Sequence, residues 1–202
     1  MFTGIIEAVG TVKSKETRGT NVTFQIESAI SPELKVDQSI SHNGVCLTVE
    51  NVAGNTHQVT AIAETLSVTN LGGWQPGTLV NLERCMMMNG RIDGHIVQGH
   101  VDGIGTCTTV VEKNGSTEFT IAFDEQSAPL VIEKGSISLN GISLTVFNIT
   151  ATSFTVAIIP YTIDHTNMRQ LQAGDKVNLE FDVIGKYILR SANLKMRKCE
   201  SR

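Results

Sequence analysis

Residues 39–51 read SISHNGVCLTVEN, and the passage returns 97 residues later as SISLNGISLTVFN at 136–148. Nine of the 14 positions in 39–52 are identical to their counterparts in 136–149. The same shift aligns VNLE at 80–83 with VNLE at 177–180, and a shift of 95 aligns Gly4 with Gly99. Self-similarity at a fixed period is the mark of a duplicated structural unit. The sequence therefore predicts two similar domains in tandem.

Each copy has the pattern of short β-strands. Apolar and polar residues alternate in VTFQI at 22–26 and in EFTIAF at 118–123, as on a strand with one buried face. KNGST at 113–117 predicts a hairpin turn, because Asn-Gly tolerates the positive φ angles of tight turns. Strands recur at spacings of about 8–12 residues without interleaved helices, which favours a small closed antiparallel barrel per copy. MMMNGRIDG at 86–94 interrupts the pattern, so we expect an N-terminal barrel over 1–97 and a C-terminal barrel over 98–182.

The segment from residue 183 to 202 breaks the strand pattern. Ile184, Tyr187, Ile188 and Ala192 lie at helical spacing, and Asp182 is placed to cap a helix that begins there. An amphipathic helix after two barrels has an apolar face to cover. That face packs either on the chain's own barrels or on a partner subunit, and the sequence leaves both open.

Composition excludes some classes of function. The chain has 202 residues, a net charge of −4 and no run of basic residues interleaved with aromatics, so it gives no support for nucleic-acid or membrane-surface binding. It has neither an apolar stretch long enough to span a bilayer nor the features of a signal peptide at MFTGIIEAVG. The cysteines at 46, 85, 107 and 199 lack metal-site spacing, so we expect reduced thiols in a cytoplasmic protein and no metal. Phosphate-binding loops and dinucleotide fingerprints are also missing.

The two copies differ at positions where chemistry is possible. The alignment sets Ile5 opposite His100, Asp37 opposite Lys134, Cys46 opposite Ser143, and Cys85 opposite Asp182. In each pair the second copy carries a group suited to hydrogen bonding or proton transfer, and histidine exchanges protons best near neutral pH. The sequence predicts that such unequal positions give the two domains different tasks.

Structural explanations exist for each of these residues taken alone. His95 and His100 in DGHIVQGH suit hydrogen-bonded core positions, and Cys46 suits a small buried apolar site. Asp182 suits a helix cap, and Lys134 a solvated loop. Ser143 has no G-x-S-x-G elbow around it, so a hydrolase is disfavoured.

Several motifs together resemble those of riboflavin synthases: MFTGII, the pair NGVCLTV and NGISLTV, ETLSVTNLG, and DGHIVQGHVDG. The similarity runs from Met1 to about residue 195. It implies an all-β fold of two similar six-stranded Greek-key barrels, with a C-terminal helix that assembles a homotrimer. It also implies a transferase that needs no cofactor. Two molecules of 6,7-dimethyl-8-ribityllumazine dismutate by transfer of a four-carbon unit, giving riboflavin and 5-amino-6-(D-ribitylamino)uracil, the last step of riboflavin biosynthesis.

The resemblance also implies a site. It lies between the N-terminal barrel of one subunit and the C-terminal barrel of its neighbour, with one lumazine on each barrel. Carried over by position, the contacts of the first barrel are Gly4, Ile5, Ile6, Ser39, Cys46, Leu47, Thr48, Thr60, Ala61, Ile62, Ala63, Glu64 and Thr65. Those of the second are Gly99, His100, Val101, Lys134, Ser143, Leu144, Thr145, Ala157, Ile158, Ile159, Pro160, Tyr161 and Thr162.

Roles follow from the same resemblance. His100 is expected to transfer a proton at the acidic C7 methyl group of the lumazine. Ser143 and Thr145 are expected to orient or activate a water that adds to C7, with Cys46 and Asp182 assisting. Tyr161 departs from the pattern, because relatives often carry a carboxylate there.

Two other functions fit a Greek-key barrel. One is a protein resembling lumazine protein, an optical antenna that holds a lumazine or flavin as a chromophore. It needs one good pocket and no catalytic set. The other is a flavin-dependent reductase, which needs a nucleotide-binding domain that this chain has no residues left to build.

Overall fold

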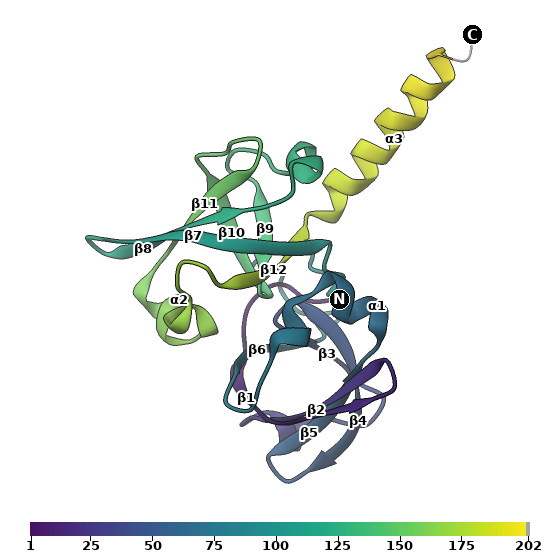
Figure 1. Cartoon of the computed structure of the whole chain (residues 1–202), viewed down its shortest axis with the longest axis vertical. Helices are drawn as coiled ribbons and strands as arrows, with labels where there is room; N and C mark the ends of the chain where they lie inside the picture. Colours follow the sequence, from purple (N-terminus) through teal and green to yellow (C-terminus); the bar gives the residue numbers. More distant parts are fainter. Residues whose placement is uncertain (201–202) are drawn as a thin grey trace.

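The computed structural model describes residues 1–200, and side chains as far as Lys195. Its strands form two closed antiparallel barrels of six strands each (Figure 1). The first barrel runs in the order β1-β2-β5-β4-β3-β6 and the second in the equivalent order β7-β8-β11-β10-β9-β12, which confirms the predicted duplication. The strands are β1 (Ala8–Arg18), β2 (Asn21–Glu27), β3 (Ser39–His42), β4 (Val45–Ala53), β5 (Thr56–Ala61), β6 (Leu79–Arg84), β7 (Gly103–Lys113), β8 (Ser116–Ala122), β9 (Ser136–Leu139), β10 (Ile142–Phe147), β11 (Ser153–Ile158) and β12 (Lys176–Phe181).

The repeated Asn-Gly pairs turn the two equivalent hairpins β3–β4 and β9–β10. Asn43 and Gly44 have φ of 49° and 80°, and Asn140 and Gly141 have φ of 47° and 82°, the left-handed region that such two-residue turns require. The two turns also meet each other. A Cβ on Gly44 would lie 2.9 Å from the Gly141 nitrogen, and one on Gly141 would lie 2.7 Å from the Gly44 nitrogen. Glycine is therefore required at both positions for two reasons: the conformation of the turn and the close contact between the barrels.

Asparagines join the barrels around these turns. Asn81 Nδ2 donates to the Asn140 carbonyl at 3.0 Å, and Asn178 Nδ2 donates to the Asn43 carbonyl at 2.9 Å. The two bonds are equivalent under the repeat, so the barrels are related by a local two-fold axis. Asn167 adds a bond to Asn81 Oδ1 through its backbone N–H at 2.7 Å. All five residues are buried or half-buried, and amides of this kind are retained inside proteins when they are hydrogen-bonded.

Each barrel has its own hydrophobic core, but the cores differ in polarity. In the first barrel His42 and His57 are fully buried, with Nε2 atoms 2.9 Å apart. Ser31 Oγ lies 2.8 Å from His57 Nδ1, and His42 Nδ1 lies 3.2 Å from the Ile40 carbonyl. One arrangement of protons satisfies all three contacts: Ser31 donates to His57, His57 to His42, and His42 to Ile40. The equivalent residues in the second barrel are the apolar Ala128, Leu139 and Phe154.

Short helices lie between strands, where the sequence predicted none. They are α1 (Ala63–Val68) and α2 (Pro160–Asp164), with 3-10 turns η1 (Ser31–Glu33), η2 (Asn70–Gly73), η3 (Glu125–Leu130) and η4 (Asn167–Gln170). Single turns are too short to show helical periodicity in a sequence.

Helix α3 (Val183–Glu200) extends away from both barrels (Figure 1). Asp182 Oδ1 accepts the N–H of Ile184 at 2.9 Å, which confirms the predicted cap. None of the described helices has the length and apolar character of a membrane span.

Candidate functional site

The equivalent strands β4 and β10 carry the unequal residues of the two domains. Cys46 is half-buried and Thr48 exposed, while Leu47 between them belongs to the core of the first barrel. Ser143 and Thr145 occupy the same outer face of β10, and Leu144 packs against the core of the second barrel. Successive strand residues point to opposite faces. Of the contacts expected on these strands, Leu47 and Leu144 can therefore offer a ligand only their backbones.

The segments that precede β1 and β7 cross to the opposite barrels. The Ser143 N–H donates to the Gly4 carbonyl at 2.8 Å, and the Cys46 N–H donates to the Gly99 carbonyl at 2.9 Å. Ile6 packs against the core of the second barrel, and Val101 against the core of the first. The N-terminus lies between the barrels (Figure 1).

The grouping of contacts expected from the sequence is wrong on this point. Gly4, Ile5 and Ile6 were expected beside Cys46, and Gly99, His100 and Val101 beside Ser143. The structure exchanges them, because each segment crosses the local two-fold axis before its own barrel begins. The segment 4–6 therefore lies with Ser143, and the segment 99–101 lies with Cys46.

Two glycines make this close crossing possible. Gly4 and Gly99 have φ of 79° and 80°. A Cβ on Gly4 would lie 2.6 Å from Ser143 Cβ, and one on Gly99 would lie 2.6 Å from Cys46 Cβ. Real side chains do not approach this closely, so both positions demand glycine for conformation and for space.

His95 joins Ser143 on the outer face of β10. Its Nδ1 lies 2.7 Å from Ser143 Oγ. Burial lowers the pKa of His95, and the nearby Asp182 carboxylate opposes this. The structure thus brings together a hydroxyl, a neutral imidazole and a carboxylate. Sequence reasoning passed over His95 because DGHIVQGH holds two histidines and no local pattern says which one reaches a strand 48 residues away.

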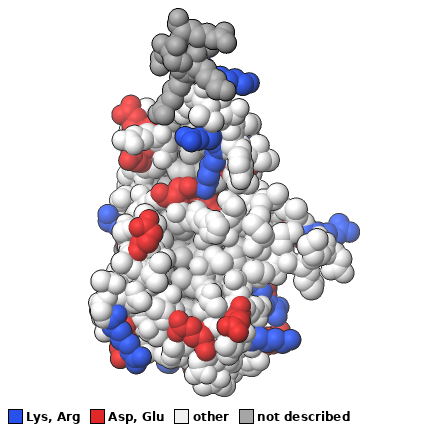
Figure 2. Space-filling view, turned by 90° about the vertical axis from the view of Figure 1, so that its right-hand side faces the viewer, with Lys and Arg blue, Asp and Glu red and all other residues white. Residues whose placement is uncertain are grey.

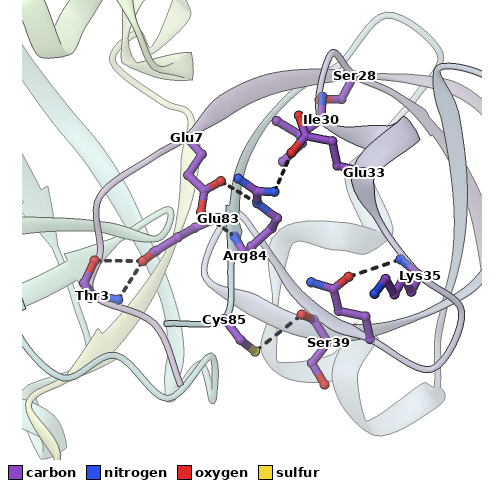
Figure 3. Close-up of polar contacts among 11 residues, drawn as sticks. Thr3, Glu7, Ser28, Ile30, Glu33, Lys35, Ser39, Glu83, Arg84 and Cys85 are labelled. Carbon is purple, nitrogen blue, oxygen red and sulfur yellow. Dashed lines mark hydrogen bonds and ion pairs between the residues drawn. The ribbon is translucent and has the colours of Figure 1, made fainter. Parts of the chain in front are cut away.

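Cys46 on β4 has the hydroxyl of Ser39 and the thiol of Cys85 as neighbours. Burial raises the pKa of the Cys46 thiol, and hydrogen bonding to Ser39 lowers it. Cys85 Sγ donates to the Ser39 carbonyl at 3.4 Å (Figure 3). Cys85 also lines a cavity of about 460 Å³ with Ile5 and Glu83. The thiol form of Cys46 therefore prevails near neutral pH, as a weak donor rather than a nucleophile.

The remaining predicted residues lie in different surroundings, from the barrel cores to the exposed surface. Lys134 Nζ stands 5.2 Å from the centre of the Phe147 ring, a cation–π contact. Tyr161 stacks on His165 with ring centres 4.1 Å apart, and it is 68% exposed. Thr60 Oγ1 lies 2.9 Å from Thr23 Oγ1. Ala61 and Ile158 are buried in the barrel cores; Thr65 and Thr162 are half-buried, and Ile62, Ala63, Glu64, Ala157, Ile159 and Pro160 are exposed.

Three of the four cysteines have side chains that the structure describes. Cys46, Cys85 and Cys107 are free, and Cys199 lies outside the described side chains. Among the described residues no group of three or more His, Cys, Asp or Glu side chains is arranged to hold a metal ion. Figure 2 shows charged residues in small separate groups over one face of the molecule, most of which is uncharged.

Comparison with known proteins identifies the duplicated unit. The lumazine binding domain family matches residues 3–85 and again residues 98–182. The chain is 40% identical to the riboflavin synthase of Bacillus subtilis (strain 168) over 191 residues, covering 94% of this chain and 89% of that protein. It is 42% identical to the riboflavin synthase of Actinobacillus pleuropneumoniae over 189 residues, covering 93% and 88%.

Solved structures support the fold. LumP in complex with riboflavin superposes with a TM-score of 0.85 at 20% identity, covering 90% of this chain and 99% of that one. LumP in complex with 6,7-dimethyl-8-(1'-D-ribityl) lumazine gives a TM-score of 0.82 at 21% identity, covering 89% and 98%. Because its repeats match lumazine-binding domains and its sequence matches these enzymes over nearly its whole length, the chain belongs to the riboflavin synthase family.

Proposed function

We propose that this chain is a riboflavin synthase, a transferase that moves a four-carbon unit between two molecules of 6,7-dimethyl-8-ribityllumazine. The products are riboflavin and 5-amino-6-(D-ribitylamino)uracil. The pair of pocket strands carries the proposal: β4 and β10 hold equivalent places in two lumazine-binding repeats but present Cys46 in one and Ser143 in the other. Two copies of one substrate need two similar pockets, which we place beside Cys46 on β4 (the first pocket) and beside Ser143 on β10 (the second pocket). The separate roles of donor and acceptor need those pockets to differ. Holding both in register contributes up to about 7–11 kcal/mol in favourable systems.

His95 and Ser143 handle a proton in the second pocket. Because burial lowers the pKa of His95, its imidazole is neutral near pH 7, and its Nδ1 accepts from the Ser143 hydroxyl. When Ser143, or a water held by Ser143 and Thr145, adds through oxygen to C7 of the bound lumazine, its proton passes to His95. The oxygen forms the new bond with its own electron pair.

His100 serves the first pocket. The Gly99 carbonyl is bonded to the backbone of Cys46, so the next residue, His100, is held beside that strand with its side chain exposed. We assign His100 the transfer of the proton from the C7 methyl group of the lumazine bound there. Cys46 assists as a weak donor from the strand, and Asp182 assists from the rim of the second barrel.

The active assembly in this proposal is a homotrimer built on α3. Ile184, Tyr187 and Ile188 are 60%, 74% and 65% exposed on a helix that leaves the barrels. Ile184 and Ile188 line an apolar groove of about 500 Å³ together with Leu130 and Ile132. Exposed apolar surface of this kind marks a site of interaction with another molecule. We infer that a neighbouring chain does so and sets its second barrel against the first barrel of this one. Free thiols suit a reducing compartment, the cytoplasm.

The experiment is a turnover assay with matched variants. The purified protein is mixed with the lumazine, and riboflavin is followed by its absorbance. His95→Gln and His100→Gln should each lower kcat by about 10²–10⁴, because each removes a proton acceptor, while the dissociation constant of the lumazine changes little. Lys13→Gln, on the surface of β1, is the control.

Three outcomes decide the proposal. Riboflavin formation by the wild-type protein, with kcat lost in the histidine variants, supports it. Equal loss of kcat and of affinity assigns the histidines to binding alone. A tightly held fluorescent lumazine without any riboflavin overturns the enzyme and favours an antenna protein.

A further inference from the structure

Two buried carboxylates hold the crossing segments. Glu83 and Glu180 are the next-to-last residues of β6 and β12, at equivalent positions in the two repeats, and they are only 3% and 2% exposed. Glu83 accepts from the Thr3 N–H at 2.6 Å and from the Thr3 hydroxyl at 2.9 Å (Figure 3). It also accepts from the Gly4 N–H at 3.0 Å. Glu180 accepts from the N–H groups of Gln98, Gly99 and His100 at 2.6, 2.9 and 2.8 Å. Each carboxylate therefore accepts three hydrogen bonds from successive residues of one crossing segment.

Each anchored segment serves the pocket of the other barrel. Glu83 belongs to the first barrel, but the Gly4 carbonyl beyond it bonds to Ser143 in the second. The Thr3 carbonyl also accepts the N–H of His95 at 3.1 Å, so one short segment touches both members of the His95–Ser143 pair. Glu180 belongs to the second barrel, but its segment carries His100 and bonds to Cys46 in the first.

We propose that Glu83 and Glu180 are positioning residues that act across the boundary between the barrels: Glu83 sets the His95–Ser143 pair of the second pocket, and Glu180 sets His100 in the first. The inference rests on the proposed function, since it concerns the groups given roles there. Neither carboxylate needs to touch substrate. A mutation in the last strand of one barrel then damages the pocket of the other.

The chemistry requires a carboxylate at both positions. An ionised carboxylate only accepts hydrogen bonds, whereas a Gln side chain has one acceptor and one NH₂ donor. Three donors converge on each Glu, so a Gln at the same place turns its NH₂ group toward an N–H and pushes part of the segment away. Burial raises the pKa of both carboxyls, while the N–H donors, and Lys186 near Glu180, favour the ionised form.

Lys186 ties the second anchor to helix α3. Its Nζ lies 2.6 Å from Asp102 Oδ2, and the same oxygen accepts the Phe181 N–H at 2.8 Å. Phe181 follows Glu180 directly on β12. The anchor of His100 is therefore braced by the helix that we assign to trimer assembly.

The test uses the histidines as reporters in Glu83→Gln and Glu180→Gln. Imidazole resonances are followed by NMR in the whole protein without substrate. Glu83→Gln should shift the resonances of His95 and leave those of His100 nearly unchanged, and Glu180→Gln should do the reverse. His42 and His57 in the first core should stay at their wild-type positions in both. Glu27→Gln, which removes a surface carboxylate paired with Lys13, is the control.

Turnover gives the second readout. A misplacement of about 1 Å at a reacting group can lower kcat about a hundred-fold, so both variants should lose kcat on that scale, and Glu27→Gln should not. If Glu83→Gln moves His100, or the core pair His42 and His57, and leaves His95 in place, each carboxylate serves its own barrel and the proposal is wrong. Because the histidine spectra need no catalysis, a wild-type protein that makes no riboflavin would overturn the function and leave this inference standing.

A measurement on the wild-type protein covers the case in which the Gln variants do not fold. The backbone amide resonances of Gly4 and Gly99 should titrate together with the carboxyl carbons of Glu83 and Glu180 as the pH is lowered. Amide signals that stay fixed while the carboxyls protonate would refute the anchoring.

Discussion

The two barrels share their strand order and their turns, but their cores differ in polarity. Their strands follow the same order, and the turns at Asn43-Gly44 and Asn140-Gly141 match in conformation and in their mutual contact. The first core contains His42 and His57, where the second has Leu139 and Phe154. The repeats are thus alike where the barrels touch each other, because a change on one side would break a contact on the other. The clearest differences lie inside the barrels, where a side chain packs only within its own core.

The chain also leaves the two barrels differently. After β6, residues 86–97 connect the first barrel to the second. Within this connection Val97 pairs with Phe2, at N···O distances of 2.7 and 3.0 Å. After β12 the chain continues outward as α3 (Figure 1). The same last strand therefore leads to an internal connection in one copy and to an exposed apolar helix in the other. The exposed apolar residues of α3 are the basis of the trimer proposed above.

Removing α3 should have the largest effect on assembly and turnover, because it takes away the element that only the second copy has. A chain cut before Val183 should lose both the trimer and all turnover, since the proposed site needs a barrel from a neighbour. Analytical ultracentrifugation and the riboflavin assay measure the two properties. Ile188→Asp keeps the chain whole and should act in the same direction, because it places a charge on the exposed apolar stripe. A monomer with full activity would disprove the shared site.

Alanine at the crossing glycines should come next. Gly99→Ala places a Cβ 2.6 Å from Cys46 Cβ, so the segment with His100 must move, and kcat should fall about a hundred-fold. Gly19→Ala is the matched control: φ is 63° there, but nothing lies within 4 Å of the added Cβ. The control should lose about 1–2 kcal/mol of stability for its left-handed backbone and keep its turnover. Equal kcat values in the two variants would contradict a tight crossing.

The histidine core should produce a smaller effect, confined to acid pH. Burial lowers the pKa of His57 from 6.5 to about 4 and lowers that of His42 as well. Between pH 6.5 and pH 4 these histidines bind protons in the unfolded chain but not in the folded barrel. Their contribution to the free energy of unfolding is therefore fully present above pH 6.5 and is lost as the pH falls toward 4. One pH unit of pKa change corresponds to about 1.4 kcal/mol, so His57 alone should cost about 3 kcal/mol at the acid end.

Exchanging the core residues tests that account. The triple variant Ser31→Ala, His42→Leu and His57→Phe takes the residues of the second barrel, and its unfolding free energy should depend less on pH than that of the wild type. Urea unfolding at several pH values between 7.5 and 4.5 gives the comparison, with the exposed His165→Gln as the control. An unchanged slope would show that acid sensitivity lies elsewhere.

Much of the fold could be predicted from the sequence, because duplication makes a pattern visible twice. Alternating strands, the Asn-Gly turns and the Asp182 cap are local signals, and each was found. The crossing was not, because no local pattern in MFTGII or DGHIVQGH says which barrel a segment will touch. The His95–Ser143 pair and the carboxylate anchors could not be predicted either, because local sequence patterns do not show long-range contacts. These depend on bonds between residues that lie 48 to 82 positions apart in the chain.

The reciprocal asparagine bonds between the barrels have a consequence for the history of the molecule. Asn81 binds the carbonyl of Asn140, and Asn178 binds that of Asn43, which is how the two subunits of a symmetric dimer contact each other. A single barrel of this kind would have paired with a copy of itself, at a rate set by its concentration. Joining the copies made that association intramolecular and independent of dilution. Once the partner was always present, the two sequences were free to diverge.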